Sequence, residues 1–94
     1  MAHPPQPASQ LTPTQAIVAT LTPEEWLLVK LRDELYDGQW EEMQADLESR
    51  LRGEPYIFKL VNRIQDDLKR MSRLRSLEAE LRVDLADFLP PTHA

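Results

Sequence analysis

The chain contains no cysteine, and glycine and histidine each occur only twice among its 94 residues. The absence of cysteine excludes a disulfide-built extracellular scaffold and any cysteine-ligated zinc site. Two glycines are too few for a glycine-rich loop that cradles a phosphate group. The sequence therefore lacks both the covalent staples of small secreted folds and the signature of a nucleotide-binding loop.

Long hydrophobic runs are also missing. The longest uninterrupted apolar stretches, residues 16–19 and 26–29, fall far short of the roughly 20 residues that cross a bilayer. Residues 1–10 carry neither the positive region nor the apolar stretch of a secretory signal. We therefore expect a cytoplasmic protein with no membrane partner.

Residues that could perform catalysis or hold a metal ion are scarce. His3 and His93 lie near the two ends of the chain, where packing cannot fix their geometry. The acidic residues between 41 and 48 show neither the Glu-x-x-His pairs of helical di-metal sites nor the spacing of an EF-hand loop. We predict that the protein is not an enzyme and has no cofactor, metal ion or small-molecule substrate.

What remains is a composition of 41% hydrophobic and 29% charged residues, which is ordinary for one globular domain. Residues 1–10 contain three prolines among small and polar side chains. Such a composition buries too little apolar surface to become ordered, so we expect a disordered tail there. Residues 11–89 are expected to form one α-helical domain, followed by a short tail over residues 90–94.

Two Thr-Pro steps, each opening a capping box, mark the starts of the first helices. They predict helices over residues 13–20 and 23–36. The dipeptide Asp37-Gly38 favours a break after the second helix, because this pair is typical of turns. In a competing interpretation the helix continues through a heptad stripe that comprises Trp26, Val29, Tyr36, Trp40, Met43 and Leu47.

A third helix is expected over residues 39–52, before Gly53. No glycine or proline occurs between Tyr56 and Leu89, so the sequence predicts one long helix over about residues 55–89. Its length would be roughly 50 Å. The predicted fold is all-α, a helical hairpin or small bundle with coiled-coil-like packing. Its predicted core includes Leu31, Leu35, Ile64 and Leu68.

The segment 38–55 resembles one tetratricopeptide repeat. The residues near that family's turn glycine, packing positions and closing proline are Gly38, Trp40, Met43, Leu47 and Pro55. The likeness covers a single repeat, Leu31 stands where the family has a small residue, and the following helix is too long to begin a second repeat. We carry over no function from this resemblance.

The predicted long helix has two apolar faces, because its stripe of apolar residues rotates by about 110° beyond Met71. We expect the second face to carry self-association, since the shorter helices cannot cover the full length of the long one. This predicted interface comprises Leu74, Leu77, Leu81, Leu85 and Phe88. The alternative is that both faces are buried within one monomer, the second being covered by the short first helix.

Charge is distributed unevenly along the chain. Residues 21–49 contain nine acidic and two basic side chains, whereas residues 50–82 contain nine basic and five acidic ones. An antiparallel hairpin would lay these two segments against each other. The candidate nucleic-acid patch comprises Lys69, Arg70, Arg73 and Arg75. The net charge of −5 opposes phosphate binding, which makes nucleic acid the weaker candidate partner.

Trp26 and Trp40 have two interpretations, as core residues or as a patch for a partner. The sequence as a whole predicts a non-enzymatic helical interaction or oligomerisation module that acts as an adaptor, scaffold or accessory subunit. Its expected partner is a second copy, as a homodimer or higher oligomer, or another protein. The alternative function is a small nucleic-acid-binding regulator or an antitoxin-like protein that uses the basic segment 69–75.

Overall fold

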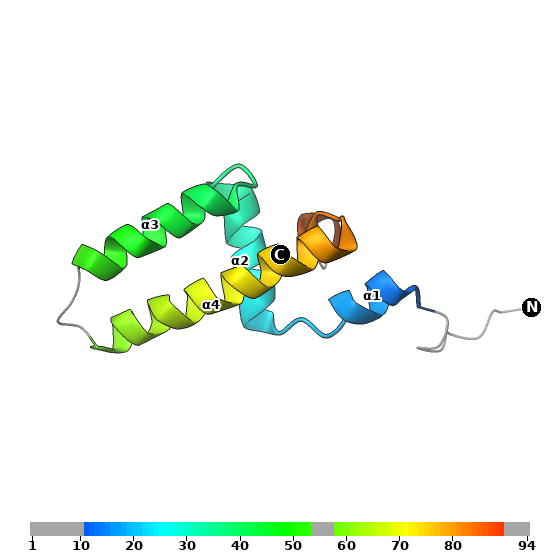
Figure 1. Ribbon diagram of the computed structural model, residues 1–94, viewed down its shortest axis with the longest axis horizontal. Helices are drawn as coiled ribbons and strands as arrows, with labels where there is room; N and C mark the ends of the chain where they lie inside the picture. The colour runs from blue at the N-terminus through cyan, green and yellow to red at the C-terminus, as the bar shows by residue number, and fades with distance from the viewer. Residues whose placement is uncertain (1–10, 54–57, 90–94) are drawn as a thin grey trace, which may run out of the picture.

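The computed structural model describes residues 11–53 and 58–89, and every regular element within these ranges is helical (Figure 1). The elements are α1 (Pro13–Val18), α2 (Pro23–Leu35), α3 (Trp40–Gly53), α4 (Phe58–Leu81) and the 3₁₀ helix η2 (Leu85–Phe88). The prediction of an all-α fold is confirmed. Both predicted tails and Pro55 lie outside the described residues.

Both predicted capping boxes are present at the starts of α1 and α2. The Thr12 hydroxyl accepts a hydrogen bond from the Gln15 N–H, and the Gln15 side chain accepts one from the Thr12 N–H. Thr22 and Glu25 repeat this exchange at the start of α2. The helices begin at these points because the boxes satisfy N–H groups that have no partner inside the helix.

The turn between α2 and α3 redirects the chain through two left-handed residues. Asp37 has φ 52° and Gly38 has φ 75°. The Gly38 N–H donates to the Arg32 carbonyl at 3.0 Å, which satisfies one of the free carbonyls at the end of α2. The predicted break is therefore confirmed, and the continuous helix of the competing interpretation is wrong.

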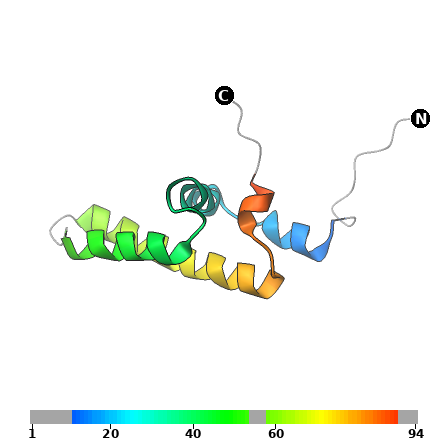
Figure 2. The ribbon, with the colours of Figure 1, turned by 90° about the horizontal axis from the view of Figure 1, so that it is seen from above.

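The predicted hairpin is formed by α3 and α4, which lie side by side and run antiparallel (Figure 1). The second layer is formed by α2, which crosses one face of this hairpin and contacts α4. In Figure 2 η2 stands beside α2 on the same face, and α1 lies beyond η2. The other flank of α2, toward the α3–α4 connection, has no helix beside it among the described residues.

The core lies where α2 crosses the hairpin. Its buried hydrophobic members are Val18, Leu21, Leu28, Val29, Trp40, Met43, Met71, Leu74 and Leu85. Ile64 is buried as predicted, whereas Leu31 and Leu68 are half-buried. The prediction for Leu35 is wrong, because 67% of its surface is exposed.

The fourth helix ends at Leu81, eight residues before the predicted end at Leu89. Arg82 adopts a left-handed conformation with φ 56°, and the Val83 N–H donates to the Glu78 carbonyl at 3.2 Å. This is the hydrogen bond of a Schellman motif, which terminates helices. The chain then folds back as η2, so the prediction of one helix over residues 55–89 is wrong at its C-terminal end.

Arg82 occupies a backbone conformation that glycine adopts at lower free energy. We expect Arg82→Gly to raise the free energy of unfolding by about 1 kcal/mol, because the side chain no longer opposes the left-handed turn. Urea unfolding followed by circular dichroism measures the change. Arg82→Ala is the matched control, because it removes the same charge and keeps the Cβ atom. An equal gain in both variants would attribute the effect to charge and contradict the backbone explanation.

Candidate functional site

A buried arginine lies at the point where the helices cross. Only 1% of the Arg32 surface is exposed. Its Nη1 atom donates to both carboxylate oxygens of Glu78, at 2.9 and 2.7 Å, and its Nη2 atom donates to Asp84 at 2.5 Å. Arg32 therefore connects α2 to α4 and to the turn that precedes η2.

Glu78 accepts two further hydrogen bonds. The Trp40 indole Nε1–H donates to it at 2.5 Å and the Leu85 N–H at 2.7 Å. The Arg32 guanidinium carbon also lies 4.5 Å from the centre of the Trp40 ring, in a cation–π contact. We call Arg32, Trp40, Glu78 and Asp84 the arginine cluster. It ties α2, α3, α4 and η2 together through one carboxylate.

The charged groups of the arginine cluster stabilise one another. Burial acts to lower the pKa of Arg32, but the hydrogen bonds to Glu78 and Asp84 outweigh it, and the pKa lies above its ordinary value. Partial burial acts to raise the pKa of Asp84, but hydrogen bonds from the Ala86 N–H and from Arg32 place it below its ordinary value. Arg32 and Asp84 therefore stay charged at neutral pH. This cluster holds the helices in place.

The two tryptophans belong with the core. Trp40 is buried with 6% of its surface exposed, and Trp26 is half-buried and packs against the core cluster. The side chain of Trp40 is fully engaged with Arg32 and Glu78. The structure places Trp40 in the core, and Trp26 keeps some exposed surface at its margin.

The leucine stripe expected to carry self-association is covered by the chain itself. Leu74 and Leu85 have no exposed surface. The other members pack against the core and are half-buried: Leu77, Leu81 and Phe88. The prediction that this stripe is uncovered is wrong, because η2 folds back and places Leu85 in the core. The structure thus agrees with the alternative in which both faces are buried within one monomer.

The basic segment 69–75 is largely paired with carboxylates. Arg70 bonds to Asp67 at 3.0 Å, Arg73 pairs with Glu25, and Arg75 bonds to Glu41 at 2.9 Å. The pKa of Glu25 is affected most by burial, which raises it, but hydrogen bonds from Thr22 and Arg73 place it below its ordinary value. Lys69 is exposed. Because three of the four cations are compensated, the segment offers little free positive charge for phosphates.

A groove that the sequence interpretation missed lies on the open flank of α2. We call it the leucine groove, and its walls are Leu27, Leu31 and Leu35 from α2 and Leu60, Arg63 and Ile64 from α4. It consists of two adjoining hollows of about 490 and 600 Å³ that share Leu28, Leu31, Arg63 and Asp67. The largest exposed apolar side chains of the groove are Leu27 at 48%, Leu35 at 67% and Leu60 at 37%.

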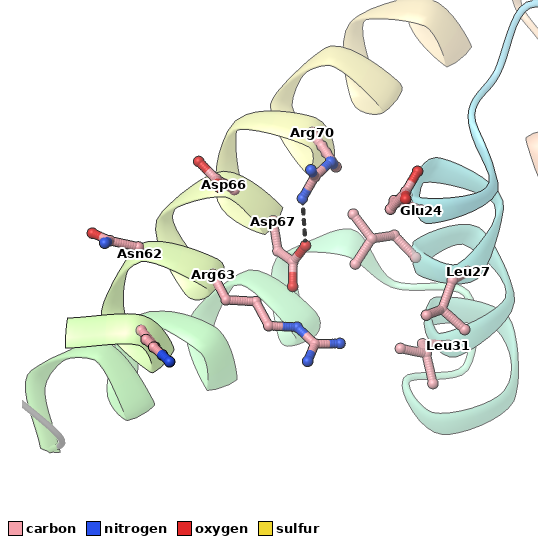
Figure 3. Close-up of a pocket in the computed structure, with 10 residues that line it drawn as sticks. Glu24, Leu27, Leu31, Asn62, Arg63, Asp66, Asp67 and Arg70 are labelled. Atoms are coloured by element: carbon pink, nitrogen blue, oxygen red, sulfur yellow. Dashed lines mark hydrogen bonds and ion pairs between the residues drawn. The ribbon is translucent and has the colours of Figure 1, made fainter. Parts of the chain in front are cut away.

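The α4 wall of the leucine groove carries the cations Lys59 and Arg63 beside the carboxylates of Asp66 and Asp67. Figure 3 shows Leu27 and Leu31 on α2 facing Arg63 and Asp67 on α4, with Arg63 extending toward α2. Among the described residues, no carboxylate lies within ion-pairing distance of Arg63 or Lys59, and both are exposed. An apolar ligand with negative charge on its flank therefore complements this wall.

The corner between α2 and α3 closes one end of the groove. There the Tyr36 hydroxyl donates to the Asp46 carboxylate at 2.5 Å, a hydrogen bond that raises the pKa of Tyr36 above its ordinary value. Arg50 lines the same end and lies 3.7 Å from Asp46. The Tyr36 hydrogen bond links the end of α2 to α3 beside the groove.

The groove exists because α2 has two different faces. Its buried face contains Glu25, Leu28, Val29 and Arg32. The leucines at positions 27, 31 and 35 recur every four residues, and at 100° per residue the centre of their stripe lies about 110° away from the centre of the buried face. This spacing of four was visible in the sequence, but Leu31 and Leu35 were assigned to the core.

The described residues contain no candidate membrane span and no candidate metal site. None of the described helices combines the length and the apolar character needed for a transmembrane span. Histidine, aspartate and glutamate form no group of three or more that could ligate a metal ion within residues 11–53 and 58–89. Comparison with protein-family models, curated proteins and solved structures finds no match to this chain.

Proposed function

We propose that this protein is a protein–protein interaction module, an adaptor or accessory subunit, that binds an amphipathic helix in the leucine groove. The observation that carries the proposal is the exposure of Leu27, Leu35 and Leu60 around one depression. Leucines exposed together around a hollow mark binding sites more often than isolated surface leucines do. These side chains are not members of the buried core and do not pack against it.

The shape of the groove favours a helix as its occupant. It lies between α2 and α4, so a helix placed in it would add a further member to an existing helical bundle. Helices bind such grooves through apolar residues three and four positions apart. Such residues can pack against the leucines of α2, which recur every four positions. The unpaired cations Lys59 and Arg63 favour a helix with acidic residues beside its apolar stripe.

Two designed helical peptides of about 18 residues test this proposal. Both carry one leucine stripe, flanked by glutamates in one peptide and by lysines in the other. We expect the glutamate peptide to bind at least about tenfold more tightly in a fluorescence anisotropy titration, and added salt to reduce this difference. A dissociation constant of about 100 µM is far weaker than that of typical helix-in-groove complexes. If neither peptide binds at that concentration, the proposal is contradicted.

Variants locate the binding site. Leu27→Glu and Leu35→Glu each place a charge on the α2 wall at an exposed position, so we expect the fold to persist and peptide binding to be lost. Leu11→Glu is the matched control, because Leu11 is also an exposed leucine, at 37%, and lies before α1, outside the groove. Peptide binding that persists in both groove variants would place the site elsewhere.

A further inference from the structure

The chain itself carries a helix with the chemistry that the leucine groove requires. The leucine stripe of α2, at positions 27, 31 and 35, has the exposed Glu24 at its N-terminal end and the exposed Glu34 along one edge. Acidic side chains beside leucines four apart are the features expected of the groove's occupant. We infer, on the basis of the proposed function, that the occupant is α2 of a second copy of this chain.

The position of the stripe makes such a contact self-complementary. In each copy α2 forms one wall of the groove. When α2 of the second copy enters the groove of the first, α2 of the first copy therefore enters the groove of the second. The same surface is then used on both sides, which is the condition for a closed two-fold dimer. The exposed leucines of both copies become buried in one contact.

The hairpin restricts how the two copies can pair. Each hairpin extends past α2 on the side of the groove (Figure 2). Two hairpins on the same side of the α2 pair would therefore collide, so they must lie on opposite sides. The two-fold axis then runs along the α2 pair, the helices are parallel, and Leu31 of one copy lies opposite Leu31 of the other.

Charge supports this arrangement. Glu34 follows Leu31 by three residues, which places it on the edge of the stripe opposite Leu28. Leu28 faces the copy's own hairpin and is buried. In the dimer, Glu34 therefore faces the hairpin of the other copy at the level of Leu35, where Arg63 lines the groove and has no carboxylate partner among the described residues. Glu34 of each copy is thereby placed beside Arg63 of the other.

Sedimentation velocity of the full chain tests the inference. We expect a monomer–dimer equilibrium with a dissociation constant in the micromolar range, as is usual for small transient interfaces. The double variant Leu27→Glu/Leu35→Glu is expected to be a helical monomer, and Leu11→Glu is expected to dimerise like the natural chain. Glu34→Lys should weaken the dimer by about tenfold or more, and its combination with Arg63→Glu should restore it.

A single introduced cysteine tests the register, because the chain has no other. Leu31→Cys is expected to form a disulfide-linked dimer on mild oxidation, since two facing positions near the axis come within the roughly 4.4 to 6.8 Å Cα separation that a disulfide spans. Ala79→Cys, also exposed but on α4, is the control and should stay largely monomeric. Equal cross-linking of both variants would show random collision and overturn the register.

The outcomes separate this inference from the proposed function. If the natural chain is monomeric at about 100 µM and still binds the glutamate peptide, the second copy is not the occupant, whereas the groove remains a helix-binding site. If neither dimer nor peptide binding is found, both proposals fail. A dimer that resists the Leu27→Glu/Leu35→Glu change uses another surface and overturns the inference alone.

Discussion

Replacement of Glu78 by alanine is expected to destabilise the fold by about 3 to 5 kcal/mol, because it breaks a buried ion pair and leaves buried donors without their shared acceptor. Three donors lose their acceptor at once: the Arg32 guanidinium, the Trp40 indole and the Leu85 N–H. Arg32 then keeps Asp84 as its only carboxylate partner among the described residues. The free energy of unfolding, obtained from urea titrations, measures this loss.

Glu80→Ala is the control for this experiment, because Glu80 is exposed and lies two residues away on the same helix. Its expected effect is within about 0.5 kcal/mol. Glu78→Gln keeps the shape of the side chain and gives a measurable variant if the alanine form does not fold. The double variant Arg32→Met/Glu78→Met removes both charges and should be more stable than Glu78→Ala. A loss at Glu78 no greater than at Glu80 would contradict the role assigned to the cluster.

Truncation of Leu74 to alanine is expected to cost about 2 to 5 kcal/mol. Leu74 has no exposed surface and lies in the middle of the core, so the substitution removes buried methyl groups and leaves a cavity. Because small domains are stable by only about 5 to 15 kcal/mol, this is a large part of the total. Thermal or urea unfolding followed at the helical circular dichroism signal measures the change.

The contrasting variant is Leu35→Ala. It removes the same atoms from a side chain that is 67% exposed, and we expect a cost below about 1 kcal/mol. The pair therefore tests the assignment of faces on two helices with one chemical change. Similar costs at both positions would mean that Leu35 is buried in solution, for example within a dimer, and repeating the titration at several protein concentrations distinguishes this case.

The helix starts and the first turn were predictable because their causes are local. Thr12 and Thr22 each act on a residue three positions later, and the turn at Gly38 depends on the backbone freedom of glycine. The end of α4 was not predictable in this way. It depends on Asp84 bonding to Arg32, 52 positions earlier in the chain. No glycine or proline marks the bend, so local signals favoured a longer helix.

The error in the faces of α2 has a different physical origin. Glu25 and Arg32 are buried, at 3% and 1% exposure, and occupy positions that a hydrophobic pattern assigns to the surface. Leu31 and Leu35 are apolar and were therefore assigned to the core. Burial of an arginine is possible here because Glu78 lies opposite, a pairing that is invisible until the chain is folded.

The same reason explains why the leucine groove was missed while the self-association stripe was proposed. The stripe from Leu74 to Phe88 was expected to be uncovered on the basis of a helix that was too long. With η2 folded back, the large apolar side chains left exposed among the described residues are Leu27 and Leu35 of α2, Leu60 of α4, and Leu11 before α1. The expectation of a protein interaction module remains a proposal. The surface proposed for the interaction is now the leucine groove, on the flank of α2 opposite η2.

The division of α2 into two faces also has an evolutionary consequence. The buried residues Val29 and Arg32 hold the fold and line neither hollow, whereas Leu27 and Leu35 line the groove and are exposed; Leu28 belongs to both sets. Substitutions at exposed positions usually change stability by less than about 0.5 kcal/mol, whereas they can alter which ligand fits. A lineage descended from this chain could therefore acquire a new binding preference through the groove residues and inherit the same folded framework.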